Sequence, residues 1–301
     1  MPMVTGDFGK LLWPGLNEIY GHAYNSWDAK WSQIFPTYTS RKHFEEDVGV
    51  TSFGLASIKD EAGAVRYDKE RQGFISRYTH VEYALGFVIS RILVEDDLYD
   101  VVGERRARGL AFSMNQTIEI VAHNVLNRAF NASYAGGDGK ELLATDHPNV
   151  SGGTFANELT TAADLSEAAL EQAVIDLMKF TDDRGLRINV MPKTLIVPVD
   201  LKFVAKRVLE SDKRVDTANN DMNALRQLGT FSDVVVTPYL TSASAWFIKT
   251  DVQDGLKHFS RRAPDFSRDN DFDTDNAKFK ATRRDSFGWS DPRGLFGSPG
   301  A

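Results

Sequence analysis

The chain contains no cysteine among its 301 residues. Disulfide bonds and thiolate metal sites are therefore excluded, and the strength of any assembly has to come from non-covalent contacts or other cross-links. No apolar run of about 18 residues occurs, so no transmembrane helix is expected. Residues 1–12 lack a basic segment followed by a long apolar one, which excludes a typical signal peptide and predicts synthesis in the cytoplasm.

Positive charge is also in short supply. The net charge is −7 and the pI is near 5.4, which argues against tight sequence-independent binding to nucleic acid, because such binding needs many Lys and Arg contacts to phosphate. Hydrophobic residues make up 42% of the chain and charged residues 26%, which is ordinary for a soluble globular protein. The length is enough for one large domain or two modest ones.

Aromatic residues are concentrated in the N-terminal segment, residues 1–45. They are Trp13, Tyr20, Tyr24, Trp27, Trp31, Phe35 and Tyr38. No single helical or strand period links them all. Two interpretations stay open: the rings cover this chain's own core, or they belong to an arm laid over a neighbouring subunit. Aromatic side chains suit the second role because they bury much area with few torsions to freeze.

The next segment predicts two strands, at residues 46–58 and 74–93, since apolar residues alternate between 81 and 89. Residues 58–73 between them are rich in charge and have almost no large apolar side chains. The charged residues are Lys59, Asp60, Glu61, Arg66, Asp68, Lys69, Glu70 and Arg71. We expect a long charged hairpin that projects from the body. A solvated hairpin is the simplest interpretation, but long two-stranded extensions are marginal alone and are often held by a partner.

The rest of the chain predicts helices alternating with short strands. Apolar residues at steps of three and four predict a long helix over 96–130, with Asp96 or Asp97 as its cap. A second helix is predicted over 164–180 with Ser166 as N-cap, and a third is predicted to begin at Asp200. Strands are expected at 194–197, 234–236, 245–248 and 277–289, with an Asp-rich loop at 259–276 and a tail of turns after 289. This order predicts an α+β fold.

Three patterns invite a chemical interpretation. His147 beside Asp146, with Ser151 as nucleophile, is the basis of a hydrolase hypothesis, but a triad is recognised by geometry and neighbouring residues on a turn rarely form the relay. Residues 136–140, Gly-Gly-Asp-Gly-Lys, lack the spacing and the Ser or Thr of a phosphate-binding loop. Asp269, Asp271, Asp273 and Asp275 alternate as in a calcium loop, but the glycine at position six and the Glu at position twelve are missing. We therefore expect no catalytic, cofactor or metal site.

One long run of sequence carries a resemblance. Its most specific residues are Thr145–Asn149 (TDHPN), Gly152–Phe155 (GGTF), Met191–Leu195 (MPKTL), Asn219–Asp221 (NND) and Arg284–Trp289 (RDSFGW). This run resembles the major capsid proteins of tailed phages, of the type found in Mu-like heads. The resemblance implies the fold named after phage HK97: an N-terminal arm, an extended β-hairpin loop, a long spine helix, a peripheral domain and an axial domain.

The resemblance also implies a division of the chain. Residues 1–45 correspond to the arm and 46–93 to the extended hairpin loop with its base strands. Residues 94–160 and 251–301 correspond to the peripheral domain, with the spine helix at 96–130, and 161–250 to the axial domain. The candidate intersubunit contacts on the arm and hairpin are Trp13, Tyr20, Trp27, Trp31, Lys59, Arg66, Lys69 and Arg71.

The function that the resemblance implies is structural. Copies would assemble as hexamers and pentamers into an icosahedral head around phage double-stranded DNA, with a separate scaffolding protein, a portal and a decoration protein as partners. The DNA would be contacted weakly and without specificity, and the protein would be part of the virion. Only about 45 residues precede the hairpin and Met1 is intact, so scaffolding is expected from a separate protein. The alternatives are a nanocompartment shell of the encapsulin type and, from another class, a metal-dependent hydrolase.

Overall fold

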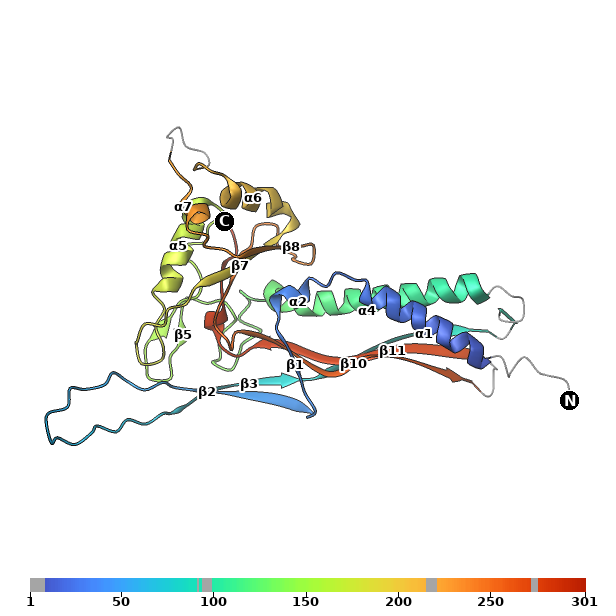
Figure 1. The fold of residues 1–301 in the computed structure, drawn as a ribbon, viewed down its shortest axis with the longest axis horizontal. Helices are drawn as coiled ribbons and strands as arrows, with labels where there is room; N and C mark the ends of the chain where they lie inside the picture. The colour runs from blue at the N-terminus through green and yellow to red at the C-terminus, as the bar shows by residue number, and fades with distance from the viewer. Residues whose placement is uncertain (1–8, 91, 94–98, 215–220, 272–275) are drawn as a thin grey trace.

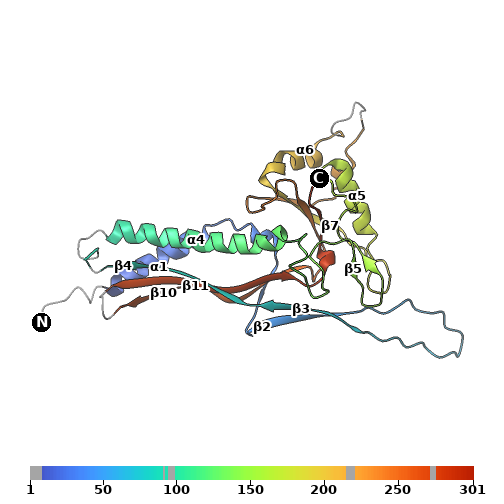
Figure 2. The same cartoon turned by 180° about the vertical axis from the view of Figure 1, so that it is seen from behind.

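A long antiparallel hairpin, β10 (Leu256–Asn270) and β11 (Ala277–Trp289), runs through the computed structural model. The structure describes residues 9–90, 92–93, 99–214, 221–271 and 276–301. β1 (Thr37–Thr39) is parallel to β10 and β4 (Val81–Ile89) is antiparallel to β11, giving the sheet order β1-β10-β11-β4. Helices α1 (Gly9–Asn25) and α4 (Tyr99–Asn127) lie together on one side of this sheet (Figures 1 and 2).

The predicted spine helix is confirmed as α4, and its apolar stripe supplies one core. Ala107, Leu110, Ala111, Met114, Ile118 and Ala122 are buried at the expected steps of three and four. Phe266 and Phe279 face them from the hairpin, and Tyr20 of α1 stacks on Phe266 with ring centroids 4.7 Å apart. Each fully buried large apolar side chain contributes about 1.5–3 kcal/mol, so this stripe fixes α4 and α1 on the sheet. Asp96 and Asp97, the predicted caps, lie outside the described residues.

A second sheet forms a separate lobe, with the order β12-β9-β7-β8. Its strands are β7 (Pro192–Pro198), β8 (Asp233–Thr237), β9 (Trp246–Thr250) and β12 (Leu295–Ser298). Its helices are α5 (Glu167–Met178), α6 (Lys202–Glu210), which follows a 3₁₀ turn at Val199–Leu201, and α7 (Ala224–Gln227). Trp246 is buried at the centre of their core, and its indole N–H donates to Ala163 O at 3.0 Å.

The remaining elements connect these two lobes. Helix α2 (Trp31–Ile34) joins α1 to β1, and β2 (Phe44–Val50) pairs with β3 (Gln72–Thr79) at the base of a loop that extends beyond the body (Figure 1). β5 (His147–Pro148) pairs with β6 (Thr154–Phe155) in a small hairpin. Gly152 and Gly153 both have positive φ in its turn, which only glycine adopts at little cost. A 3₁₀ turn at Pro292–Gly294 precedes β12.

Asn157 ties the C-terminal segment to the lobes. Its side chain is fully buried, and its Nδ2 donates to Leu142 O at 2.8 Å and to Pro292 O at 2.9 Å. Its Oδ1 accepts from Ala144 N at 2.9 Å. One amide thus satisfies main-chain groups on two distant segments, as buried polar groups require.

The Asp-rich loop predicted at 259–276 is wrong, because β10 runs to Asn270. Register shifts after Ser260 and Arg262 break the alternation in the sequence. They let Phe259 and Phe266 both become buried although the two lie seven positions apart, an odd spacing that hides the period-2 pattern.

The tail of turns predicted after residue 289 is also wrong in part. Residues 295–298 form β12, and all four are buried against β9. Gly and Pro on both sides of Leu295 and Phe296 indicate turns locally, but pairing with β9 decides their structure. The N-terminal segment likewise contains a helix that no single period predicted. Among the residues of α1 whose burial is described, 15–25, Leu16 and Tyr20 are the deeply buried ones.

The predicted caps had mixed outcomes. Ser166 is the N-cap of α5, and its Oγ accepts from Ala169 N at 3.2 Å, which confirms the prediction. Asp200 was predicted to cap the third helix, and this is wrong: it lies inside the 3₁₀ turn, and neither that turn nor α6 has a side-chain cap.

Glu119 of α4 holds the segment between α1 and α2 in place. Its buried carboxylate accepts from Lys30 N at 2.7 Å, from Trp31 N at 3.1 Å and from the Trp27 indole at 3.3 Å. Burial raises the pKa of this carboxyl, while the three donors act in the opposite direction. One carboxylate on the spine helix therefore accepts three hydrogen bonds from the segment that joins α1 to α2.

We expect Glu119→Ala to lower the free energy of unfolding by about 2–4 kcal/mol, because three donors lose their acceptor. Urea denaturation monitored by tryptophan fluorescence measures this change. Glu18→Ala, on an exposed position of α1, is the matched control and should change stability by about 0.5 kcal/mol or less. An equal effect of the two variants would contradict the fastening role.

Asp285 of β11 anchors a second buried network. His258 Nε2 lies 2.9 Å from Asp285 Oδ1, Arg283 donates to Asp285 Oδ2, and Arg283 also donates to the Tyr24 hydroxyl on α1. Burial raises the pKa of Asp285, but the hydrogen bonds from His258 and Arg283 outweigh it and hold the pKa below its ordinary value of 3.8.

This direction predicts a pH dependence. A carboxyl whose pKa is lower in the folded state stabilises that state above the unfolded pKa. The stability should therefore be lost as pH falls below about 4. Asp285→Asn should flatten the acid side of a plot of thermal midpoint against pH, at a lower midpoint throughout. An unchanged acid slope would show that other carboxyls control acid unfolding.

Candidate assembly surfaces

The extended loop, residues 51–71, projects beyond the body and pairs only at its base. Thr51 N donates to Arg71 O at 3.0 Å, and Arg71 N donates to Thr51 Oγ1 at 2.9 Å. Residues 52–71 form no strand. The predicted projection is present, but the predicted two-stranded hairpin is wrong beyond this point, because the two legs separate.

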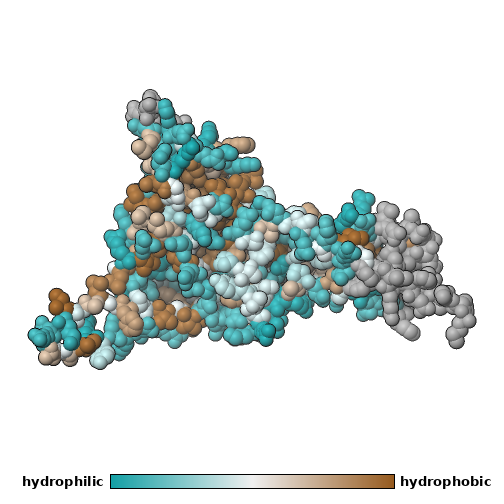
Figure 3. Space-filling model, in the orientation of Figure 1, coloured by the Kyte–Doolittle hydropathy of each residue, from teal (hydrophilic) through white to brown (hydrophobic). Residues whose placement is uncertain are grey.

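The loop also exposes more apolar surface than its charge suggested. Ile58 is 98% exposed and Tyr67 is 91% exposed. Phe53, Leu55 and Val65 are exposed as well. Figure 3 shows apolar side chains among polar ones at the far end of the loop. Exposed apolar side chains that occur together often mark an interaction site, so the loop has the composition of an interface.

The predicted cationic contacts fall into two groups. Among the described residues, Lys59 and Arg66 have no hydrogen-bond or ion-pair partner, and both are exposed. The main chain of Lys69 and Arg71, in contrast, is already engaged within the chain. Lys69 O accepts from Arg184 Nη2 at 2.8 Å. An intersubunit role for these four side chains stays a prediction.

A turn of the second lobe steadies the loop. Arg184 Nη1 donates to Asp68 Oδ2 at 3.1 Å, and Ser52 donates to Asp182. The backbone N–H groups of Gly54 and Lys69 hold the pKa of Asp68 below its ordinary value. Asp182 and Arg184 gave no signal in the sequence, where they simply precede Gly185 in a charged turn.

The N-terminal aromatics are placed mainly on this chain's own core. Tyr20 is only 4% exposed, so its selection as an intersubunit contact needs correction: its ring is already covered by Phe266. Trp31 lies edge-on to His258 and Phe287, and Trp27 lies edge-on to Phe112. Both are partly buried. The side chain of Trp13 lies outside the described residues.

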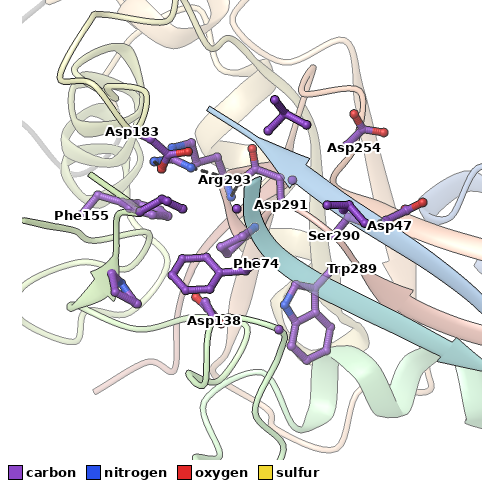
Figure 4. Close-up of a pocket in the computed structure, with 18 of the residues that line it drawn as sticks. Asp47, Phe74, Asp138, Phe155, Asp183, Asp254, Trp289, Ser290, Asp291 and Arg293 are labelled. Carbon is purple, nitrogen blue, oxygen red and sulfur yellow. Dashed lines mark hydrogen bonds and ion pairs between the residues drawn. The ribbon is translucent and has the colours of Figure 1, made fainter. Parts of the chain in front are cut away.

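A cavity of about 460 Å³ separates the base of the loop from the body (Figure 4). Val48 and Phe74 line it from β2 and β3. Phe155 and the segment Trp289–Arg293 line it from the opposite side. Apolar packing is therefore interrupted where the loop leaves the body.

Ion pairs and hydrogen bonds of charged side chains bridge the two sides of this cavity. Asp47 of β2 accepts from Lys257 Nζ at 2.5 Å and from Ser290 Oγ at 2.6 Å. Burial lowers the pKa of Lys257, but hydrogen bonds to Asp254 and Asp47 outweigh it and raise that pKa. Arg293 stacks over the Phe155 ring at 3.9 Å and donates to Asn149 Oδ1 at 2.8 Å. These polar contacts set the position of the loop base relative to the body.

The residues of the hydrolase hypothesis are not brought together as a triad. His147 is fully buried, with Nδ1 2.6 Å from Asp138 Oδ2 and Nε2 3.1 Å from Asn157 Oδ1. Asp146 instead pairs with Lys140 Nζ at 2.5 Å. Asp138 comes from the Gly-rich run 136–140, where a Cβ on Gly137 would lie 2.4 Å from Ile75 O. This run is a tight turn that supports His147 beneath β3.

The other candidate patterns gather no set of metal ligands in the part of the chain that the structure describes. Among the described residues, no group of three or more His, Asp or Glu side chains is placed to hold a metal ion. Asp271 pairs with Lys278 at 2.6 Å, while Asp273 and Asp275 lie outside the described residues. No helix in the described part of the chain is long and apolar enough to cross a membrane.

The second lobe has apolar surface of its own. Val199, Phe203, Met222 and Leu228 are exposed around α6 and α7, and Figure 3 shows apolar side chains on this lobe. The basic residues of the spine helix are partly engaged: Arg108 pairs with Glu104, and Arg106 Nη1 donates to Val88 O at 2.8 Å.

Asp47 and Lys257 make a testable pair. Asp47→Ala should loosen the loop base by about 1–3 kcal/mol, because Lys257 and Ser290 lose an acceptor in a half-buried site. Hydrogen exchange of peptides covering residues 44–50 and 72–79 measures it. Glu46→Ala, whose carboxylate lies 3.8 Å from Arg77 Nε, is the control. Slower or unchanged exchange in the Asp47 variant would contradict the role of Asp47 in holding the loop base.

Comparisons with known proteins agree with this geometry. A family model described as phage capsid protein matches residues 75–297. The procapsid protein of bacteriophage JBD30 has a TM-score of 0.55 at 13% identity, covering 98% of this chain and 76% of that one. The virus-like particle from Pyrococcus furiosus has a TM-score of 0.51 at 15% identity, covering 94% and 97%. The capsid of Myoviridae Phage XM1 has a TM-score of 0.52 at 12% identity, covering 88% and 90%.

No curated protein matches the chain. The structural neighbours are too distant in sequence to show more than the fold, which is the HK97-like α+β fold that the resemblance implied. The family model matches most of the chain, and this match shows the family to which the chain belongs. The chain belongs to the phage capsid protein family and is a structural major capsid protein, not an enzyme.

Proposed function

We propose that copies of this chain assemble as hexamers and pentamers into an icosahedral shell around the double-stranded DNA of a tailed phage. The observation that carries the proposal is the extended loop. It holds Ile58 and Tyr67 almost fully exposed, far from the core of their own chain. Burying such side chains is worth about 25 cal/mol per Å², and closed symmetry repeats each contact around the shell.

We propose the following division of labour within the subunit. Residues 1–45 are the arm, and residues 46–93 form the extended loop with its base. Residues 94–160 and 251–301 form the peripheral domain around the spine helix, and 161–250 form the axial domain. Sheet pairing supports two adjustments: β4 belongs with the peripheral sheet through β11, and β12 belongs with the axial sheet through β9. The apolar surface near Phe203 would then meet other copies at the capsomer axis.

The partners we propose are a separate scaffolding protein, a portal and a decoration protein, with assembly in the host cytoplasm. Contact with packaged DNA is proposed to be weak. The net charge of −7 supports this, and so does the engagement of Arg106 and Arg108 within the chain. Exposed ion pairs are worth about 0–1 kcal/mol each, so charges on the loop would set register more than strength.

The test combines two substitutions in the loop, Ile58→Asp with Tyr67→Ala. We expect the yield of closed shells to fall at least tenfold, because apolar contact area is replaced by a charge, while the thermal midpoint of the free subunit stays unchanged. Electron microscopy and light scattering of the same fractions measure shells. Glu70→Ala, at an exposed position of the same loop, is the control and should assemble normally. Wild-type protein that stays monomeric with the scaffolding protein of its own genome would overturn the proposal.

A nanocompartment shell is the second candidate, and the similarity to the virus-like particle from Pyrococcus furiosus favours it. The two differ in contents. Shells recovered from cells infected by the phage, or from induced cells, should contain DNA if the first proposal holds. Protein cargo without DNA would favour the nanocompartment.

A further inference from the structure

Strand β4 ends the peripheral sheet with an unprotected edge. It pairs with β11 without a register shift from Val81 to Ile89, and no described strand lies on its other side. It has no proline and one charged residue, Glu82. Val81, Leu85 and Val88 are exposed on it. Soluble proteins usually protect such edges with charges, proline, bulges or short strands, as the three-residue β1 does at the opposite edge.

The direction of the backbone groups on β4 can be inferred. In an antiparallel strand the N–H and C=O of successive residues point to alternate sides. Val88 O accepts from Arg106 of α4 and so points away from β11. By the same parity, Glu82, Ala84 and Gly86 direct their backbone groups outward. These three residues form a template about five residues long for one more strand.

We propose that this edge receives the extended loop of a neighbouring copy, through residues 64–68, as an added strand. The inference rests on the proposed self-assembly and names the surface that the loop would use. Residues 64–68 belong to no strand of their own chain, and the exposed Val65 and Tyr67 alternate with Arg66 and Asp68, as an added strand requires. The length of this leg matches the template on β4.

Charge complementarity favours the same pairing. Lys280 lies opposite Gly86 on the adjacent strand, and Arg106 lies at Val88. Both are exposed. The loop apex carries Asp60 and Glu61, which form no ion pair with any described residue. An acidic apex beside a basic strand edge would fix the register of the added strand, while main-chain hydrogen bonds and the apolar side chains hold it.

The absence of cysteine makes a clean test available. The full-length double variant Ala84→Cys with Val65→Cys, and its companion Ala84→Cys with Arg66→Cys, are assembled into shells with the scaffolding protein and oxidised. We expect disulfide-linked ladders of subunits from at least one pair, because facing residues on adjacent strands place Cβ atoms about 4.5–5.5 Å apart. Ala84→Cys alone, and Ala84→Cys with Ser113→Cys on α4, are the controls and should remain monomeric on denaturing gels.

Hydrogen exchange provides the second readout without any substitution. The amides of residues 82, 84 and 86 should exchange at least 100-fold more slowly in shells than in free subunits. Shells that form with these amides unprotected, and with neither pair cross-linked, would overturn the added strand while leaving the capsid function intact. Protection without a cross-link to the loop would assign the edge to another partner and would also overturn this proposal. Failure of the wild-type chain to assemble would count against the proposed function instead.

Discussion

The long antiparallel ladder between β10 and β11 is the constraint on which the other elements depend. β1 and β4 pair with its two sides, and α4 packs over it. Lys257, near the start of β10, forms an ion pair with Asp47 at the base of the extended loop. The end of β11 leads into the segment Trp289–Arg293, which lines the cavity. Because Asp285 of β11 also reaches Tyr24 through Arg283, the ladder fixes the N-terminal arm as well. A change in its register would displace the arm, the loop base and the spine helix together.

Different kinds of interaction hold the body of the subunit and its extensions. The two lobes are held by apolar cores around Phe266 and Trp246. The N-terminal segment and the loop base have polar attachments in addition, among them Glu119 for the former and Asp47 for the latter. Close-packed cores have few alternative arrangements. A polar contact beside a cavity can be replaced by another polar contact with little loss of packing. A subunit of the proposed hexamers and pentamers needs both properties, since its body has to persist while its extensions adapt to five or six neighbours.

The fold was predictable wherever one face of an element is buried along its whole length. The stripe from Ala107 to Ala122 announced α4, and the alternation from Phe279 to Phe287 announced β11. Prediction failed where tertiary pairing overrides local pattern. Bulges hide the alternation of β10, and β12 consists of two large apolar residues between turn residues. The capsid resemblance came from motifs such as residues 145–155, whose structural role is to form the small hairpin and to carry Asn149 to Arg293.

By itself, the sequence determined the absence of disulfides, the α+β class, the spine helix, the family and the existence of a projecting loop between residues 58 and 73. Only the tertiary structure decided which aromatic rings of the arm are already covered, since Tyr20 meets Phe266 across more than two hundred residues. It likewise decided that His147 binds Asp138 and Asn157 and not Asp146, and that β4 lies at an open edge. The physical reason is the same in each case. Local patterns record which side of an element is buried, whereas the partner that buries it is set by long-range packing.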